Sequence, residues 1–295
     1  MIEVRKLSTL TLDEALETWN KGFEGYVYDQ KMSLDQFIQR FGNEGLSPEL
    51  SVVAFVDGEP AGLVLNGLRT VNGKKVSWNG GTGVAVKYRR TGVGKALMEE
   101  TLKLYRENDV DIATLEAAKS NIKAISLYKQ YGYDLIDDLV FLQNKEPLSK
   151  DSFTFEENPK GYTSRRGHAH EAGSLPIINH LVPWQTHWLS LRRDGELLVI
   201  EDQGEAVGYF LFKKQYDDSG KPTALVLFSA GLAPNRPDAE DIARYGFGVL
   251  FGPHDVPMNR ATFNFPSSNI EIVALLKELG FTPYTEQVFM VKHLK

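Results

Sequence analysis

The first half of the chain alternates between short apolar segments and longer stretches in which apolar residues recur at the helical period. Short runs rich in β-branched residues are typical of strands, whereas the longer recurrence is typical of an amphipathic helix. In the clearest helical stretch, Val93, Leu97 and Leu104 fall on one face. The strands that this pattern predicts are residues 2–7, 51–56, 61–68, 75–86 and 112–117.

Capping residues mark where the predicted helices begin and end. Thr11 followed by Glu14 predicts a capping box at the start of a first helix, and Ser33 begins a second one. Gly132 predicts a left-handed stop for a later helix over residues 121–131. The first half therefore contains strands and helices in alternation.

Glycine, asparagine and aspartate predict the turns of a sheet. Asn72-Gly73 is a hairpin signal, and Gly80-Gly81 inside a predicted strand indicates a bulge or a close backbone approach. Residues 135–143 are expected to form a final hairpin that turns at Asp137-Asp138.

The second half of the chain repeats parts of the first. Residues 269–281 align without a gap on residues 121–133, and residues 204–208 echo residues 58–62 between two predicted strands. At 295 residues the chain also has the length of two domains. The polar segment 144–151 reads as the linker between them. The expected domains are residues 1–145 and residues 150–295.

Composition excludes several classes of protein. The chain has no cysteine, which excludes disulfides, thiolate metal sites and a cysteine nucleophile. Its net charge of −6 argues against sequence-independent binding of nucleic acid. No apolar run is long enough to cross a bilayer, and the N-terminus has no apolar signal core. A cytoplasmic protein with no membrane or nucleic-acid partner is expected.

The segment from Gly83 to Met98 combines the end of a strand, two glycines and the start of a helix. Arg89, Gly92 and Gly94 form the pattern Arg-x-x-Gly-x-Gly at this junction. Glycines let a ligand approach the backbone closely. The first turn of the following helix has free N–H groups at the positive end of its dipole. Together these features predict a cradle for a phosphate or diphosphate.

A second motif follows at residues 121–133, with the form Asn-x-x-Ala-x-x-Leu-Tyr-x-x-x-Gly-aromatic. In this order and spacing, the two motifs closely resemble the GNAT acetyltransferases, which bind acetyl-coenzyme A (acetyl-CoA). The resemblance implies an α+β fold with two GNAT-like domains, each a twisted, mixed, mostly antiparallel sheet flanked by helices. The cofactor-binding residues it implies are Val84, Ala85, Val86, Arg89, Arg90, Thr91, Gly92, Val93, Gly94, Lys95, Asn121 and Tyr128.

The same resemblance implies roles close to the reacting atoms. Tyr128 is expected to assist the departing thiolate, and backbone N–H groups near Val84 are candidates for the oxyanion. Glu116 is the candidate general base, because its segment is similar to that of the ribosomal-protein alanine acetyltransferases; a structural role for it stays open. In GNAT proteins the connection between the first two helices lines the acceptor site. The substrate-binding residues this implies are Phe23, Tyr26, Tyr28 and Asp29, whose aromatic members have simple packing as the alternative.

The second copy lacks this chemistry. The position of Tyr128 is occupied by Leu276, and residues 234–241 carry three carboxylates and no Gly-x-Gly. Carboxylates at a helix start would repel a diphosphate. Acetyl-CoA is therefore expected to bind only the first domain, and the second is expected to cover it, shape the acceptor cleft or form a homodimer.

The sequence thus predicts an enzyme that moves an acetyl group from acetyl-CoA directly to an acceptor, most plausibly the primary amine of a small molecule. A non-catalytic acetyl-CoA sensor is the alternative from another class, and an acyl group other than acetyl also stays open. Histidines at His168, His170, His180 and His187 do not form a ligand pattern, so that no metal is predicted.

Overall fold

The chain forms two compact units. The computed structural model describes residues 1–149, 153, 161–252, 254 and 257–295. The first unit contains Met1–Ile136 together with Val288–Lys295, and the second contains Asp137–Gln287. The domain limits expected from the sequence stay a prediction, and part of the expected linker, residues 150–152, lies outside the described residues.

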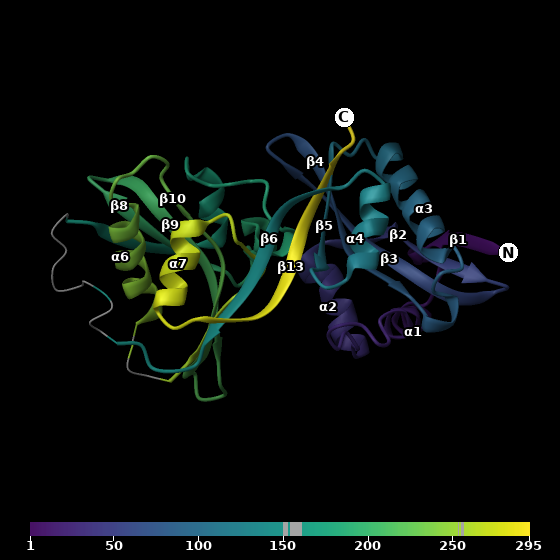
Figure 1. Cartoon of the computed structure of the whole chain (residues 1–295), viewed down its shortest axis with the longest axis horizontal. Coiled ribbons are helices and arrows are strands. Elements are labelled where there is room, and N and C mark those ends of the chain that lie inside the picture. Colours follow the sequence, from purple (N-terminus) through teal and green to yellow (C-terminus); the bar gives the residue numbers. More distant parts are fainter. Residues whose placement is uncertain (150–152, 154–160, 253, 255–256) are drawn as a thin grey trace. The chain divides into compact units, whose positions relative to one another are not determined.

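A mixed sheet forms the centre of the first unit (Figure 1). Its strands are β1 (Ile2–Lys6), β2 (Leu46–Val56), β3 (Glu59–Val71), β4 (Lys74–Val84), β5 (Ile112–Ala118) and, from Val288 onward, β13 (Thr282–His293). They lie in the order β1-β2-β3-β4-β5-β13. Strands β1 to β4 pair antiparallel, whereas β4 and β5 pair in parallel and are therefore joined by a crossover helix.

Two pairs of helices cover the two faces of this sheet (Figure 1). On one face lie α1 (Leu12–Gly22) and α2 (Leu34–Glu44), where the rings of Trp19 and Phe37 have centroids 6.3 Å apart. On the other face lie the crossover helix α3 (Val93–Glu107) and α4 (Ile122–Gln130). The apolar core beneath α3 and α4 includes Val288 and Met290, which are 1% and 0% exposed. The last part of β13 therefore completes the core of the first unit.

The predicted helix starts are confirmed. Thr11 and Glu14 form a capping box on α1, in which the Glu14 carboxylate accepts a 2.8 Å hydrogen bond from the Thr11 N–H. Ser33 caps α2 in the same way. Gly132 ends α4 with φ 79°, the left-handed conformation that glycine adopts without steric cost.

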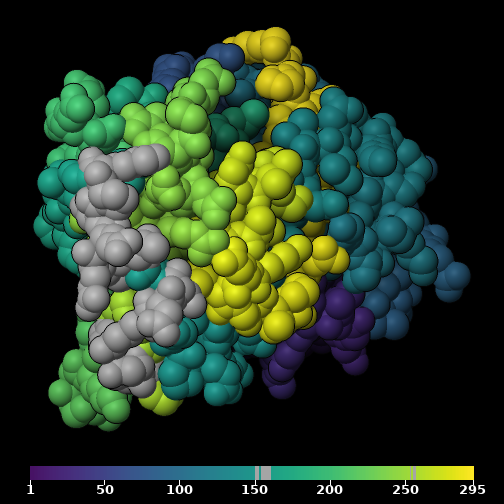
Figure 2. Space-filling view, turned by 60° about the vertical axis from the view of Figure 1, so that its left-hand side comes forward, coloured from purple at the N-terminus to yellow at the C-terminus, as the bar shows by residue number. Residues whose placement is uncertain are grey.

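The second unit has the same plan around its own mixed sheet. Its strands are β6 (Asp134–Asn144) from Asp137 onward, β7 (Thr163–His168), β8 (Glu196–Asp202), β9 (Glu205–Tyr216), β10 (Pro222–Leu232), β11 (Asn259–Thr262) and β12 (Phe265–Pro266). The order is β6-β11-β10-β9-β8-β7, with β12 beside β6. Its helices are α5 (Trp188–Leu191), α6 (Ala239–Phe251) and α7 (Ile270–Glu278), of which α7 is exposed at the surface in Figure 2.

Backbone geometry confirms the internal repeat. Asn121 and Asn269 precede α4 and α7 with φ/ψ of −86°/65° and −80°/69°. Gly280 ends its helix with φ 82°, as Gly132 does in the first unit. In each unit a parallel strand pair, β4–β5 or β10–β11, is bridged by one long helix. The two aligned segments are therefore equivalent elements of two related sheets.

The predicted hairpin over residues 135–143 is wrong, because β6 runs as one strand from Asp134 to Asn144. The carboxylates that suggested a turn have another role within the second unit. Asp137 accepts hydrogen bonds from the Ser267 hydroxyl and the Ser268 N–H, at 3.1 and 3.2 Å. Among the described residues, no helix has both the length and the apolar character needed to span a bilayer.

Candidate functional site

Strand β4 has an open edge at its C-terminal end. Within residues 1–149, all of which are described, its register with β3 continues to Val84, whereas its register with β5 covers only Val76–Asn79. Antiparallel pairing alternates the direction of successive N–H groups. Because the Ala85 N–H donates to Ala61 on β3, the Val84 N–H points to the open edge. Of the backbone N–H groups predicted to stabilise the oxyanion, that of Val84 is thus the best placed, whereas that of Ala85 already donates to a partner.

The predicted bulge lies on this open edge. The register between β3 and β4 shifts between Asn79 and Gly81, and Gly81 has φ 154°. A Cβ at Gly81 would come within 2.7 Å of the Trp19 ring, and one at Gly83 within 2.9 Å of the Phe23 ring. Glycines here let aromatic side chains of α1 and the following loop lie directly on β4.

The predicted anion cradle forms where β4 passes into α3. Gly92 precedes the helix with φ 97°. Helix α3, which lies entirely within the described residues, has neither a side-chain cap nor an acidic residue in its first turn. Its first N–H groups and the positive end of its dipole are therefore available to an anion. A Cβ at Gly94 would make only an ordinary contact, 3.5 Å from Leu127, so packing alone does not require glycine there.

Tyr128 lies beside the open edge. Its side chain, from α4, is 6% exposed, and burial raises its pKa to about 12, partly offset by a hydrogen bond with Thr82 of β4. Asn121 begins the same helix and its Oδ1 accepts a 3.2 Å hydrogen bond from the Ala124 N–H. The second motif, residues 121–133, thus places the buried phenol of Tyr128 beside β4, the strand that leads into the first motif.

The loop between α1 and α2 reaches this point through Tyr26. Burial raises the pKa of Tyr26, while hydrogen bonds with the Asn121 side chain and the Ala118 backbone act in the opposite direction. Tyr26 and Tyr128 are close enough to influence each other's ionisation. The structure therefore brings a predicted acceptor residue next to a predicted catalytic one.

Glu116 is held on β5 by an indole. The Trp78 Nε1–H donates to Glu116 Oε2 over 2.7 Å, and Trp78 is 2% exposed. Glu116 is half-buried on the strand that ends just before Asn121.

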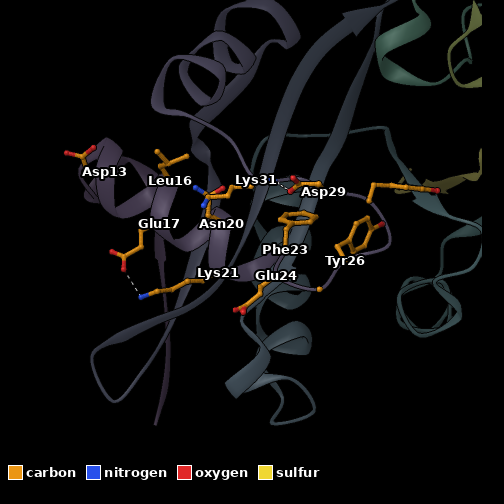
Figure 3. Close-up of a pocket in the computed structure, with 12 residues that line it drawn as sticks. Asp13, Leu16, Glu17, Asn20, Lys21, Phe23, Glu24, Tyr26, Asp29 and Lys31 are labelled. Carbon is orange, nitrogen blue, oxygen red and sulfur yellow. Dashed lines mark hydrogen bonds and ion pairs between the residues drawn. The ribbon is translucent and has the colours of Figure 1, made fainter.

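A pocket of ≈ 770 Å³ contains all four predicted acceptor residues (Figure 3). Its lining is Asp13, Leu16, Glu17, Asn20, Lys21, Phe23, Glu24, Gly25, Tyr26, Tyr28, Asp29 and Lys31. Three aromatic rings form one part of it, and the other part carries carboxylates, of which Glu17 pairs with Lys21 at 2.6 Å. The sequence analysis missed the residues from α1. Their signal was the four-residue spacing of Asp13, Glu17 and Lys21, which places them on one helix face.

Comparison with known proteins points to one family for this site. Residues 12–133 match the Acetyltransferase (GNAT) family. This part of the chain is therefore similar to the GNAT acetyltransferases. The curated relative found is N-alpha-acetyltransferase 30 of Dictyostelium discoideum, 30% identical over 92 residues. The match covers 31% of this chain, and the chain spans half of that relative's length (50%).

Solved GNAT structures cover the whole chain. A GCN5-related N-acetyltransferase from Sphaerobacter thermophilus is 17% identical with a TM-score of 0.62, covering 100% of this chain and 96% of the other. One from Anabaena variabilis has 16% identity and a TM-score of 0.62, with 100% and 73% covered. A tandem GNAT protein from the clavulanic acid biosynthesis pathway has 14% identity and a TM-score of 0.57, with 99% and 98% covered. At these identities the likeness concerns the fold, and the predicted α+β class with two GNAT-like domains is confirmed.

The second GNAT-like unit has a pocket at the equivalent strand end but a different anion corner. This pocket, of ≈ 570 Å³, lies along the end of β10 and reaches Asn269. Beside it, Arg236 pairs with Asp202 and Asp238, each at 2.7 Å, and Asp238 stands where α6 begins. Glu240 and Asp241 add negative charge in the first turn. The positive charge of Arg236 is therefore already neutralised, and the remaining negative charge makes this corner of the second unit unfavourable for a diphosphate.

The histidines form no metal centre in the described part of the chain. The rings of His168 and His170 lie 5.8 Å apart and parallel, and those of His180 and His187 lie 6.0 Å apart. No group of three or more side chains of the kinds that bind metals is found among the described residues.

Proposed function

We propose that the protein transfers the acetyl group of acetyl-CoA directly to a primary amine of a small molecule, and that the first unit performs the chemistry. One observation carries the proposal: a buried phenol, Tyr128, forms a hydrogen bond with Thr82 of β4 and is close enough to the acceptor-loop residue Tyr26 to be influenced by its charge. The cradle at the start of α3 is suited to the diphosphate, and the open edge of β4 is suited to an extended amide chain.

The residues divide the reaction between them. Acetyl-CoA supplies the thioester carbon that the amine attacks, so that a C–N bond forms and the C–S bond breaks. The Val84 N–H faces the edge where negative charge develops on the carbonyl oxygen. Glu116 takes the proton that the amine loses, directly or through water. Tyr128 donates a hydrogen bond to the departing sulfur.

The raised pKa of Tyr128 defines the form of its help. A thiol has a reference pKa near 8.5, and the pKa of Tyr128 is about 12. Against a thiol in water, complete proton transfer from phenol to thiolate would be uphill by roughly 5 kcal/mol, and burial of the thiol beside Tyr128 would reduce this difference. Donation of a hydrogen bond without complete transfer avoids this cost, and the thiolate can later be protonated by solvent.

The shape and charge of the acceptor pocket support a small amine. Four carboxylates and two lysines line it, an excess of negative charge that favours a cation. The aromatic rings offer faces to a cationic group. The name of the curated relative points to a protein N-terminus instead; the acceptor screen below distinguishes the two.

The test is an acceptor screen that follows release of the free thiol. A panel of amino sugars, polyamines, amino acids and N-terminal peptides is offered with acetyl-CoA. Stimulation by an amine above the rate of thioester hydrolysis supports the proposal, and Tyr128→Phe serves as the control. If no amine stimulates thiol release although acetyl-CoA binds, the chain is a sensor of acetyl-CoA and the proposal fails.

A further inference from the structure

Arg89 uses its guanidinium in a way that its motif position does not predict. As the first residue of Arg-x-x-Gly-x-Gly it is expected at the rim of the anion cradle. Its Nε donates a 2.9 Å hydrogen bond to the Val84 carbonyl oxygen. Its Nη2 donates to the carbonyl oxygens of Gly22 and Glu24, at 3.4 and 2.5 Å. The side chain thus joins three main-chain carbonyls from two separate segments.

Two of these carbonyls lie where the acceptor loop leaves α1. Gly22 is the last residue of α1, and the final carbonyls of a helix have no partner within it. A cation at that end also complements the helix dipole. Glu24 lines the acceptor pocket. Arg89 therefore stabilises the point at which the helix ends and the pocket begins.

Backbone packing brings the same point against β4. A Cβ on Gly22 would lie 3.0 Å from the carbonyl carbon of Gly83. The Val84 carbonyl that Arg89 holds belongs to the open edge of that strand. The start of the acceptor loop and the edge expected to bind the coenzyme are consequently in direct contact, with Arg89 bonded to both.

The remainder of the loop is held by other contacts. The Trp19 Nε1–H donates to the Gln30 carbonyl oxygen at 2.7 Å, and the Met32 N–H donates to Asn20 Oδ1 at 2.9 Å. Tyr26, in the middle of the loop, forms hydrogen bonds with the Asn121 side chain and the Ala118 backbone. The loop has no helix or strand over residues 24–33, all of which are described. Arg89 therefore holds the first residues of the loop, at Gly22 and Glu24, against β4.

We propose that Arg89 is a positioning residue that clamps the acceptor loop to β4, so that coenzyme binding in the cradle orders the acceptor pocket. Residues 90–95 surround the expected diphosphate, and fixing them fixes the backbone of Arg89 as well. The guanidinium passes this restraint to Gly22 and Glu24. The coupling rests on the proposed function for its ligand, whereas the clamp itself is a property of the free protein.

Three variants of the full chain separate positioning from charge. Arg89→Lys keeps the cation but cannot join three carbonyls with one compact ammonium. Arg89→Ala removes both the cation and its hydrogen bonds to the three carbonyls. Arg90→Ala removes a neighbouring cation that makes none of these bonds to the acceptor loop, and serves as the contrast. Hydrogen–deuterium exchange of residues 23–31 is measured with and without coenzyme A, and coenzyme A affinity is measured by calorimetry.

The clamp predicts the same result for both Arg89 variants. Exchange in residues 23–31 should be about tenfold faster than in the parent, the factor that corresponds to losing the net effect of one hydrogen bond to a charged group. Coenzyme A should slow this exchange in the parent and not in the variants. Its dissociation constant should rise by no more than about twofold for Arg89→Lys, whereas Arg90→Ala should weaken binding without loosening the loop.

The opposite pattern would overturn the inference. If Arg89→Ala leaves exchange in residues 23–31 unchanged and weakens coenzyme A binding as much as Arg90→Ala does, then Arg89 acts as a phosphate ligand. If coenzyme A does not bind the parent, the proposed function fails, and the exchange rates without ligand still decide whether the clamp exists. Once an acceptor is known, its KM should rise in both Arg89 variants while kcat changes little.

Discussion

At the scale of single residues, environment changes what each side chain can contribute. The reference pKa of tyrosine is near 10, whereas burial raises the pKa of Tyr128 to about 12. The phenol therefore remains protonated across the whole working range of pH. It can serve as a hydrogen-bond donor throughout and is a poor source of a transferred proton.

Replacing this donor tests the chemistry. Tyr128→Phe should lower kcat by about a hundredfold or more, the effect expected of removing a hydrogen-bond donor to developing negative charge. Coenzyme A affinity should change by less than about twofold, because the ring remains in place. In the parent, activity should not decline through ionisation of Tyr128 as pH rises to 10, well below its pKa of about 12. Unchanged turnover of the variant would remove Tyr128 from the mechanism.

Asn121 contributes to stability as the N-cap of α4. Because its Oδ1 accepts the Ala124 N–H at the start of α4, Asn121→Ala should lower the free energy of unfolding by about 1 kcal/mol. Asn121→Ser retains a capping oxygen and should lie close to the parent. Urea denaturation of the full chain measures both, and equal losses in the two variants would show that the cap is not the cause.

At the scale of elements, the two glycines at the junction between β4 and α3 differ in the reason why glycine is needed. Gly92 is required by its backbone, which has φ 97°. Gly94 has ordinary surroundings, with the nearest contact of an added Cβ at 3.5 Å. The second glycine is therefore better explained by close approach of a ligand than by packing.

The two glycines should respond differently to alanine. Gly94→Ala should raise the free energy of unfolding slightly, by about 0.5 kcal/mol, because alanine favours a helix. The same change should weaken coenzyme A binding by at least about tenfold, because the methyl group occupies the path of the diphosphate. Gly92→Ala should instead lower stability by about 1 kcal/mol. Thermal unfolding measures the stability of both variants, and calorimetry measures their binding of coenzyme A. Undiminished binding of coenzyme A by Gly94→Ala would contradict the predicted anion cradle.

Local chemistry made some elements predictable from the sequence. Capping boxes, the Gly132 stop and the Gly80-Gly81 bulge each depend on residues that are close in sequence, and the structure has all of them. The residues of the α1–α2 loop were expected at the acceptor site from the resemblance to the GNAT fold, and the structure brings them together in one pocket.

Other features depend on partners that are distant in sequence. A hairpin was expected at residues 135–143 because β6 needs neighbours and two aspartates imitate a turn, yet within the second unit β6 pairs with β11 and β12. The hydrogen bonds of Arg89 to Gly22 and Glu24 are equally non-local. Local patterns contain no information about such contacts. The spacing of Asp13, Glu17 and Lys21 does place them on one face of α1, but it does not show that this face lines the pocket.

At the scale of the whole molecule, two related units differ in what they can bind. The first leaves its helix start free of acidic residues, whereas the second fills the same corner with Arg236 and Asp238. The Arg236 guanidinium holds the pKa of Asp238 well below its usual range, so this pair stays ionised at all ordinary pH values. Both units thus share the fold, and we expect an anion site only in the first.

Calorimetry should accordingly find one coenzyme A per chain. Gly94→Ala should remove that single binding event, which would locate it in the first unit. Two equivalent sites, or a full-strength site that survives Gly94→Ala, would contradict this assignment.

The core of the first unit should be sensitive to substitution of a residue that follows the second unit in the sequence. Met290 is fully buried beneath α3 and α4, so Met290→Ala should cost about 2–5 kcal/mol. His293→Ala, an exposed neighbour on the same strand, should change stability by less than about 0.5 kcal/mol. Faster hydrogen exchange in α3 and α4 of the Met290 variant would locate the loss in the first unit.

The position of residues 288–293 in the first sheet has a consequence for synthesis. While the ribosome is still making the second unit, β5 has not yet received its neighbour β13, and its apolar edge and the hollow under α4 await Val288 and Met290. In this state the nascent chain exposes one strand edge of β5 without a hydrogen-bonding partner, and such an edge promotes aggregation. The core of the first unit is complete only after translation has passed Met290, so that a chain truncated before this residue would carry both motifs with part of that core missing.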